Sequence, residues 1–289
     1  MAKERVLKRV GVDELPKYTP WVARILGLDP FSKPVRDLAK IDTQYDKDIY
    51  AKLLVYAKKH PGANPTDIRR QEVQREPNTT VCFSKKGKLY LTSAADLQRL
   101  SDKVLVDVLA EPLSRTRVVV ELGCGYGYNL SVLRNFFPNH VWIGGEYSKN
   151  AMELASQLFA ACEGISVVPF NWYDSTWVVL EGLVEKAVVF TKFSVNELPQ
   201  AVSIIPIFAK YKSKISEVIH LEPVYELTDN HSTLGLMRRA YTLLNDYNTD
   251  LLTTLTGMRA VQILKTEYDL IGANPLYPTS LVWWRFTEE

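Results

Sequence analysis

Apolar side chains recur at helical spacing through about the first 75 residues, and prolines interrupt the pattern. Val22, Ile25 and Leu26 form one such set, and Leu53 and Leu54 belong to another. The residue before a proline is pushed out of the helical region of backbone space, so we predict short helices that end near these prolines. The predicted breaks are Leu15-Pro16, Thr19-Pro20, Asp29-Pro30 and the loop 60–65.

Two short runs of strand-forming residues, 81–83 and 89–91, flank a polar turn that contains Gly87. Glycine tolerates the left-handed backbone that a tight turn requires, so we predict a β-hairpin at this place. Ser93 or Asp96 is then positioned to cap the helix that follows.

From residue 118 the pattern changes to short β-type runs that alternate with helical ones. Such alternation is typical of a parallel, doubly wound sheet with helices on both of its faces. The five β-type runs are 118–120, 142–144, 165–168, 187–190 and 218–221, and the connections include helices at 129–137 and 152–158.

The C-terminal part has another pattern: a helix over 234–255, then two strands, 261–265 and 281–286, that only a loop separates. Such strands pair antiparallel if they are neighbours, because a parallel pair needs a long crossover. We therefore predict an α/β fold with a doubly wound, mostly parallel, seven-stranded sheet that ends in an antiparallel hairpin. We expect residues 1–92 to form a helical cap with the small hairpin, and 93–289 to form a Rossmann-like domain.

The chain of 289 residues has 46% hydrophobic and 24% charged residues, a balance typical of globular proteins. Its net charge is only +2, whereas nucleic-acid enzymes usually carry a clear basic excess, so a nucleic-acid partner is disfavoured. Three scattered cysteines favour neither a disulfide framework nor a metal site. No apolar signal segment and no run of membrane-spanning length occurs. We therefore expect a cytoplasmic protein with no metal and no membrane partner.

A glycine-rich loop after the strand 118–120 is the strongest functional indication. Gly123, Gly125 and Gly127 let the backbone turn sharply and approach a ligand with no Cβ in the way. In open α/β sheets, ligands bind at this carboxyl edge, where the strand order reverses. A dinucleotide site would have glycine where this chain has Tyr128, so the loop favours another class of cofactor.

Two acidic residues indicate a cofactor that has a cationic end and a ribose. Glu121 precedes the first glycine by two residues, and a carboxylate there suits a cation better than a diphosphate. S-adenosylmethionine carries a sulfonium and an amino group. Glu146 ends the second predicted strand, about 20 residues beyond the loop, where a ribose-binding carboxylate belongs. An ionised carboxylate accepts hydrogen bonds from both ribose hydroxyls.

The runs ELGCGYG and GGEY resemble those of class I S-adenosylmethionine-dependent methyltransferases. The organisation of residues 95–289 is similar to that family, and to its bacterial enzymes for small molecules and natural products. The resemblance implies S-adenosylmethionine as cofactor. The sheet of that family also ends with an antiparallel strand pair, as we predict for this chain.

The resemblance also implies that the end of the third strand binds the adenine amino group, where this chain has Asn171 in place of the usual acid. An amide oxygen also accepts such a bond. Trp172 or Tyr173 is placed to pack on the adenine ring. The cofactor-binding residues expected in this way are Glu121, Gly123, Cys124, Gly125, Gly127, Glu146, Tyr147, Asn171 and Trp172.

Methyl transfer from a sulfonium is an in-line displacement, in which the protein chiefly aligns donor and acceptor. A base is needed only when the acceptor must lose a proton. His220 and Glu222 end the fifth predicted strand and point to the same side of it, and His231 lies in a polar loop. Histidines ordinarily titrate near neutrality, as a base requires. These three residues are the catalytic candidates, and each also has a purely structural interpretation.

The acceptor is expected over the edge that follows the fourth strand, where Asn196 is a candidate ligand and Glu197 is another. Tyr225 follows the fifth strand, while Tyr18, Trp21 and Tyr45 would line the acceptor pocket if the N-terminal helices cover it. The chain has no Asn-Pro-Pro-Tyr run of the kind found in nucleic-acid amino-methyltransferases. Aromatic residues make up 11% of the chain, which favours an aromatic acceptor. Together with the resemblance to natural-product methyltransferases, this implies an acceptor such as the indole of a tryptophan-containing cyclic dipeptide.

Several alternatives remain open from the sequence. A sugar O-methyltransferase, or an enzyme that methylates RNA or protein, would share the cofactor site. A noncatalytic subunit that binds S-adenosylmethionine for a partner enzyme would lack the base and the enclosed acceptor space. Tyr128 disfavours a nicotinamide-dependent oxidoreductase. The oligomeric state is also open, a homodimer included.

Overall fold

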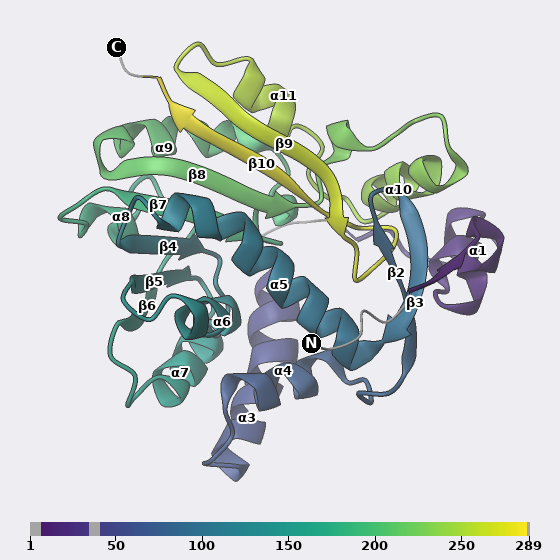
Figure 1. Ribbon diagram of the computed structural model, residues 1–289, viewed down its shortest axis with the longest axis horizontal. Coiled ribbons are helices and arrows are strands. Elements are labelled where there is room, and N and C mark those ends of the chain that lie inside the picture. Colours follow the sequence, from purple (N-terminus) through teal and green to yellow (C-terminus); the bar gives the residue numbers. More distant parts are fainter. Residues whose placement is uncertain (1–6, 35–40, 288–289) are drawn as a thin grey trace.

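A seven-stranded sheet forms the middle of the molecule in the computed structural model, which describes residues 7–34 and 41–287 (Figure 1). Its order is β6-β5-β4-β7-β8-β10-β9, in which β10 pairs antiparallel with both β8 and β9 and the other neighbouring strands are parallel. The predicted, mostly parallel sheet with an antiparallel C-terminal pair is therefore confirmed. The strands are β4 (Val118–Leu122), β5 (Val141–Glu146), β6 (Ile165–Pro169), β7 (Ala187–Lys192), β8 (Ile215–Glu222), β9 (Val261–Ile271) and β10 (Thr279–Phe286).

Helices cover both faces of this sheet, and each face has its own apolar core. Helices α5 and α6 pack over Val119 and Trp142, whereas α8, α9 and α11 pack over Val120 and Trp284. Successive strand residues point to opposite faces, so Val119 and Val120 belong to different cores. The elements are α5 (Ala94–Leu113), α6 (Tyr128–Phe136), α7 (Lys149–Leu158), α8 (Val178–Glu181), α9 (Ile205–Lys210), α10 (Thr233–Leu244), α11 (Leu251–Thr256), and the short turns η3 (Val195–Glu197), η4 (Ala201–Ser203), η5 (Lys212–Lys214) and η6 (Tyr225–Leu227).

The strand order reverses at β4, which has β5 on one side and β7 on the other. The connections that leave β4 and β7 therefore diverge at the carboxyl edge of the sheet. The glycine loop joins β4 to α6 at this edge, and Glu146 ends β5 beside it. The topology thus brings the predicted cofactor residues to one place.

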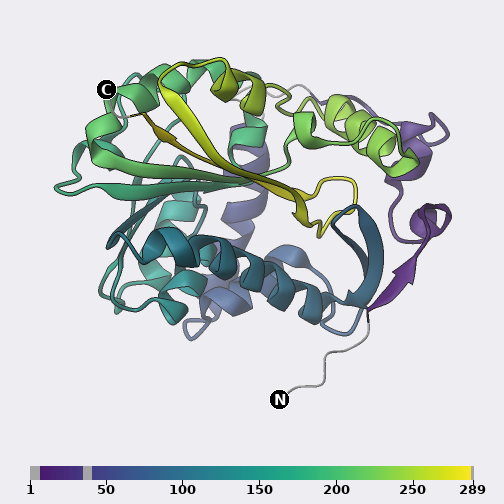
Figure 2. The same ribbon diagram turned by 45° about the horizontal axis from the view of Figure 1, so that its top comes forward.

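A second, smaller sheet lies beside the end of the β9–β10 hairpin (Figure 2). The predicted hairpin is confirmed, and its turn residues Lys86 and Gly87 both have positive φ, as a tight hairpin turn requires. Ser84 pairs with Gly272, so this hairpin is joined to the C-terminal strands. The strands, in the order β1-β3-β2, are β1 (Lys8–Val10), β2 (Thr80–Lys85) and β3 (Lys88–Ser93).

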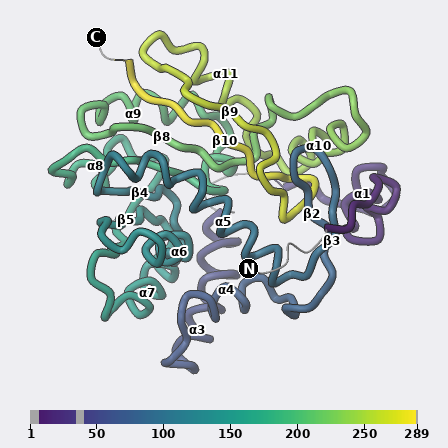
Figure 3. Tube along the Cα trace, in the orientation of Figure 1, coloured from purple at the N-terminus to yellow at the C-terminus, as the bar shows by residue number. Residues whose placement is uncertain are grey.

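The N-terminal helices divide between two places, as the trace in Figure 3 shows. Helix α1 packs against α10, whereas η2 and α3 pack against α7 beside the glycine loop. Part of the N-terminal region therefore covers the carboxyl edge of the sheet. No helix of the described ranges combines the length and apolar character that a bilayer span requires. The elements are η1 (Val12–Lys17), α1 (Trp21–Ile25), η2 (Thr43–Tyr50), α3 (Ala51–Lys59) and α4 (Pro65–Val73).

Two predicted boundaries are wrong. The helix expected over 234–255 is two helices, α10 and α11. Asp246 adopts a φ of 56° between them, and the Asn248 side chain accepts a 3.1 Å bond from the Leu251 N–H at the beginning of α11. The break expected before Pro16 does not occur, since Pro16 lies inside η1. The N–H groups of Glu14 and Tyr18 donate hydrogen bonds at the two ends of η1, so the missing N–H of Pro16 is tolerated.

Candidate functional site

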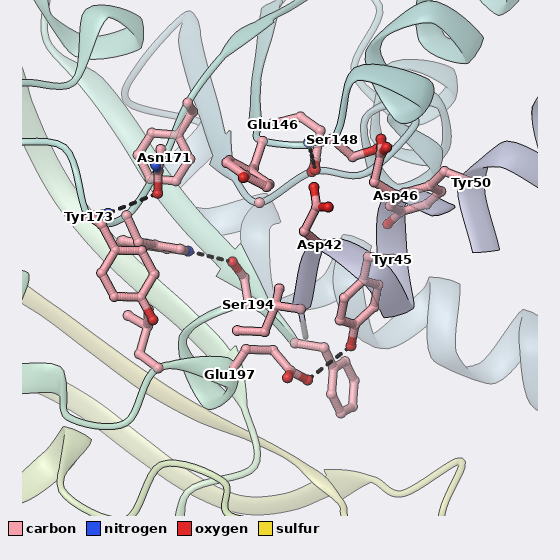
Figure 4. Close-up of a pocket in the computed structure, with 17 residues that line it drawn as sticks. Asp42, Tyr45, Asp46, Tyr50, Glu146, Ser148, Asn171, Tyr173, Ser194 and Glu197 are labelled. Carbon is pink, nitrogen blue, oxygen red and sulfur yellow. Dashed lines mark hydrogen bonds between the residues drawn. The ribbon is translucent and has the colours of Figure 1, made fainter. Parts of the chain in front are cut away.

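A cavity of about 110 Å³ opens at the carboxyl edge of the large sheet, under η2 (Figure 4). Glu146 lies on one side of it, Asn171 and Tyr173 on a second, and Glu197 faces Tyr45 on a third. Sequence segments that are far apart therefore meet around one space. The lining residues are Ile41, Asp42, Tyr45, Asp46, Tyr50, Gly123, Glu146, Tyr147, Ser148, Phe170, Asn171, Trp172, Tyr173, Phe193, Ser194, Glu197 and Leu198.

The glycine loop is held in a backbone conformation that favours glycine. Gly123, Gly125 and Gly127 have φ values of +77°, +56° and +83°. A Cβ on Gly123 would lie 2.0 Å from the Ser194 hydroxyl oxygen, and one on Gly125 would lie 2.6 Å from the Tyr50 hydroxyl oxygen. Side chains are therefore excluded here by backbone strain and by close neighbours. The Cys124 side chain points away, into the core that contains Trp142.

Glu146 connects the glycine loop to the beginning of α7. Its Oε2 accepts a 2.7 Å bond from the Gly125 N–H, and its Oε1 accepts a 2.8 Å bond from the Ser148 N–H. The side chain is buried, which raises the pKa of its carboxyl, while these N–H donors act in the opposite direction. Each carboxylate oxygen has a second lone pair, so Glu146 retains capacity for ligand hydroxyls.

Glu121 is fully buried two residues before the glycine loop. Its Oε1 accepts a 2.6 Å bond from Asn129 Nδ2, and Lys192 Nζ donates to Asn129 Oδ1 at 3.1 Å. Within the described residues, Glu121 Oε2 has no hydrogen-bond partner. Burial raises the pKa of this carboxyl to about 8, although Asn129 and Lys192 oppose the shift. An unsatisfied buried carboxylate oxygen is costly, so a donor from a ligand would be favourable there.

The connection after β6 forms an aromatic wall. Trp172 Nε1 donates to the Ser194 hydroxyl at 2.9 Å, and the Trp172 ring meets Phe170 edge to face at 4.8 Å. Asn171 Oδ1 accepts a 3.0 Å bond from the Tyr173 N–H, and all of these residues line the cavity. The predicted adenine-binding position therefore lies beside a flat apolar surface.

Segment η2, which contains the predicted pocket residue Tyr45, forms the roof of the cavity. Asp46 accepts bonds from the Ser148 hydroxyl at 2.5 Å and from the Asn150 N–H at 3.0 Å. On the opposite side, the Tyr45 hydroxyl donates to Glu197 at 2.9 Å. Segment η2 is a π-helix, a rare conformation that is frequent at functional sites, and no residue pattern in 43–50 announces it.

Glu222 and His220 point to the same side of β8, as predicted, since both contact the Thr191 hydroxyl. Glu222 also accepts bonds from the Ser194 and Val195 N–H groups at 3.0 and 3.1 Å, and so holds the loop that contributes Ser194 to the cavity. Burial raises the pKa of Glu222 to about 7. Burial lowers the pKa of His220 to about 3, and its ring stacks on Trp284.

Of the predicted site residues, those that line this cavity are Tyr45, Gly123, Glu146, Tyr147, Asn171, Trp172, Tyr173 and Glu197. Glu121, Cys124, Gly125, Gly127, His220 and Glu222 lie outside its lining, and so do the remaining candidates. His231 is exposed, and its backbone N–H donates to Asp229. The Tyr225 ring lies 4.0 Å from the Arg239 guanidinium. Trp21 packs edge to face on Tyr241 in an apolar cluster that also includes Tyr18. Asn196 is buried beside the cavity, and its Nδ2 donates to Glu197 at 3.1 Å. Within the described residues, no group of three His, Cys, Asp or Glu side chains is arranged to hold a metal ion.

No protein-family model and no curated protein matches the chain. Solved structures similar to it include the mitomycin 7-O-methyltransferase MmcR, with 14% identity over 92% of this chain and 75% of that chain and a TM-score of 0.48. Geranyl diphosphate C-methyltransferase from Streptomyces coelicolor has 11% identity over 67% and 82%, with a TM-score of 0.47. The Podospora anserina methyltransferase PaMTH1 has 9% identity over 90% and 100%, also with a TM-score of 0.47. Because these identities and TM-scores are low, we base the proposed function on the geometry and chemistry of the residues around the cavity.

Proposed function

We propose that this chain is an S-adenosylmethionine-dependent methyltransferase that acts on a small-molecule acceptor. The observation that carries the proposal is the pairing of three glycines in left-handed conformation with Glu146, which accepts hydrogen bonds from the Gly125 and Ser148 N–H groups on its two sides. Ligands of doubly wound sheets bind at this edge, and a ribose needs a carboxylate acceptor beside the loop.

The residues at the site fit this cofactor in their chemistry. Glu146 would accept from the ribose hydroxyls, Asn171 and Trp172 would meet the adenine, and the loop backbone would approach the remainder. Glu121 lies outside the cavity lining and is fully buried, and its unsatisfied Oε2 would suit the amino group once the cavity widens to admit the cofactor. When bound, the cofactor supplies a methyl group activated by the sulfonium.

The cavity is smaller than ligand pockets usually are, at about 110 Å³ against roughly 300–1,000 Å³. The Tyr50 hydroxyl approaches the backbone at Gly125, in the space that a cofactor would use. Binding therefore requires η2 to move outward, and its contacts to Ser148 and Glu197 allow it to close again over the ligand.

The protein would accelerate transfer chiefly by orientation and by exclusion of water. Holding donor and acceptor in line contributes several kcal/mol, about 7–11 in well-oriented intramolecular cases. Glu222 would contribute through the loop that it holds. The base, where the acceptor needs one, is proposed among His231, His220 and Glu222.

His231→Ala tests the base hypothesis. If His231 is the base, turnover falls by about 10²–10⁴-fold while affinity for S-adenosylhomocysteine stays unchanged, because the residue lies outside the cofactor wall. Steady-state kinetics and calorimetry on the same preparation separate the two quantities. Unchanged turnover would remove His231 as the base.

An aromatic acceptor of the indole type, such as a tryptophan-containing cyclic dipeptide, is our proposed substrate. Support comes from the rings that line the cavity, among them Tyr45, Trp172 and Phe193. The roof that η2 forms favours a small acceptor over RNA or a folded protein. The test is incubation with methyl-labelled S-adenosylmethionine and a panel of indoles and sugars. Label in an indole supports the proposal, and label only in a sugar or only in added RNA would overturn the acceptor class.

A further inference from the structure

Helices α4, α5 and α6 come together on one side of the molecule (Figure 1), and a groove of about 660 Å³ lies between them. Among the described residues, this groove and the cavity at Glu146 share no lining residue. The volume of the groove lies in the range of small-molecule sites, roughly 300–1,000 Å³. The groove is therefore large enough to hold a ligand independently of that cavity.

Apolar side chains line the groove along α6. Tyr128, Val132 and Phe136 follow one another at four-residue spacing, so they lie on one face of this helix. Phe136 is 63% exposed, and Val73 at the end of α4 is 36% exposed. A row of apolar side chains at the surface is typical of a site that a ligand or a partner covers.

Basic side chains outnumber acidic ones among the described residues that line the groove, by five to two. Both acids already accept hydrogen bonds on both of their oxygens. Asp102 accepts from Gln98 Nε2 at 2.8 Å and from the Tyr128 hydroxyl at 3.0 Å, and Asp107 accepts twice from Lys103 Nζ at 2.7 Å. The charged side chains of the groove therefore offer chiefly donors to a ligand. The basic residues are Arg69, Arg70 and Arg75 from α4 and the segment after it, and Arg99 and Lys103 from α5.

Three of the arginines are paired with acids that lie outside the lining of the groove. A guanidinium has five N–H donors, so a single carboxylate leaves several of them for a ligand. The acids outside the groove also offset its positive charge, so attraction of an anion depends on direct contact and not on a long-range field. The pairs are Arg69–Glu72, Arg70–Asp67 and Arg99–Asp96.

We propose that this groove binds an amphipathic organic anion, a small molecule with a carboxylate, sulfonate or phosphate on a flat apolar body. The arginines would donate charge-assisted hydrogen bonds to the anionic group, and Val132 and Phe136 would pack against the apolar body. A nucleic acid fits less well, because contacts to its phosphates would leave the apolar row on α6 uncovered. The inference goes beyond methyl transfer and does not depend on it, because the groove lies outside the cavity at Glu146.

The test uses two fluorescent dyes that differ only in an anionic group: 8-anilinonaphthalene-1-sulfonate and the neutral N-phenyl-1-naphthylamine. Each is titrated into the full-length protein, with and without S-adenosylhomocysteine. We expect one saturable site for the sulfonate, with an affinity about tenfold higher than that of the neutral dye, because only the sulfonate accepts from the arginines. Equal or tighter binding of the neutral dye, or no saturable binding of the sulfonate, would overturn the proposal.

S-adenosylhomocysteine should leave the affinity for the sulfonate unchanged, since the groove and the cavity share no lining residue. Loss of dye binding when S-adenosylhomocysteine is added would place the dye in the cavity and overturn the proposal. Failure of S-adenosylhomocysteine itself to bind would count against the proposed function alone.

Two sets of substitutions locate the dye in the groove. The double variant Arg75→Gln, Arg99→Gln removes two exposed cations, so affinity for the sulfonate should fall about tenfold while affinity for the neutral dye stays unchanged. Phe136→Ala removes the exposed ring and should weaken the binding of both dyes. Arg259→Gln, at an exposed arginine between α11 and β9, is the matched control and should change neither affinity. Unchanged binding of the sulfonate in the double variant would contradict the assignment to this groove.

Competition separates a small ligand from a nucleic acid. We expect 1-naphthyl phosphate, which combines a flat apolar body with an anionic group, to displace the sulfonate dye. Displacement by polyuridylate at a lower nucleotide concentration than 1-naphthyl phosphate requires, with a steep dependence on salt, would assign the groove to nucleic acid and overturn the proposal.

Discussion

The two sides of the cavity are built from contacts of very different sequence range. On the cofactor side, Glu146 accepts from Gly125, which lies 21 positions earlier, and both belong to one β–α–β unit. On the roof side, Tyr45 reaches Glu197 across 152 positions, and Asp46 reaches Ser148 across 102. A parallel sheet edge thus defines the proposed cofactor side by local chain geometry, whereas the proposed acceptor side depends on how distant segments pack.

Substitution of Glu146 should have the largest effect on cofactor affinity, because this residue lies on the proposed cofactor side of the cavity. Glu146→Ala removes the acceptor for ribose hydroxyls and the link between Gly125 and Ser148. We expect affinity for S-adenosylhomocysteine to fall by roughly 1–3 kcal/mol, which is about 5- to 150-fold. Calorimetric titration measures this change.

Glu153→Ala is the matched control for that measurement. Glu153 is also a glutamate of the β5–α7 unit, but it lies on the surface of α7 and pairs with Lys58. Exposed pairs of this kind contribute little, so cofactor affinity should stay within about twofold of the wild type. Equal affinities in all three proteins would contradict the ribose assignment.

The titration of Glu121 predicts the next largest effect, a pH dependence of the affinity for S-adenosylhomocysteine. Burial raises the pKa of this carboxyl from its usual 4.5 to about 8, so it is mostly protonated at pH 6. The ammonium group of a bound ligand would stabilise the ionised form of Glu121. Binding at pH 6 would therefore release the proton of this carboxyl. We expect affinity for S-adenosylhomocysteine to rise severalfold between pH 6 and pH 8.

Glu121→Gln should flatten this pH profile. Titration in buffers of different ionisation enthalpy gives the number of protons released, and proton uptake by the wild type would contradict the account. Without ligand, the raised pKa means that the folded state binds this proton more tightly than the unfolded chain. The contribution of this group to stability is therefore fully present below about pH 4.5 and is lost as the pH rises through about 8.

Loosening the attachment of η2 to α7 should have a smaller effect, mainly on the rates at which the ligand binds and dissociates. Asp46→Ala removes the bonds from Ser148 and Asn150 that hold η2 to α7. Their loss costs about 1 kcal/mol net in the closed state, so S-adenosylhomocysteine should both associate and dissociate about fivefold faster. Stopped-flow tryptophan fluorescence follows this change, with Trp172 in the cavity wall as a reporter. Asp48→Ala, on the exposed side of the same segment, is the control; unchanged rates in both variants would rule out η2 as a gate.

The same difference in sequence range explains how much the sequence could predict. The antiparallel pair at the C-terminal end of the sheet, the hairpin at Gly87 and the meeting of Gly123 and Glu146 at one cavity follow from strand periodicity and turn chemistry, whereas Asn171 is named through the family resemblance. The sequence predicts Tyr45 as a pocket residue, but its bond to Glu197 and the role of Asp46 depend on a π-helix without a sequence signature and on partners more than 100 positions away.

The break in the helix predicted over 234–255 was missed for a related reason. Its apolar spacing continues across the break, while the interruption depends on the single-residue conformation of Asp246. Asn248 also forms a tertiary bond to the Leu198 carbonyl, which sequence periodicity does not reveal. Where a side chain bonds to a distant segment, hydrophobic spacing alone does not determine the boundary of an element.

The most direct test of the account is calorimetric titration of the wild-type protein with S-adenosylhomocysteine, with NADH as the control ligand. We predict one saturable site for S-adenosylhomocysteine and no heat of binding for NADH, because the loop has Tyr128 where a dinucleotide site has glycine. Binding of NADH, or of neither ligand to the folded protein, would contradict the assignment of the glycine loop to S-adenosylmethionine.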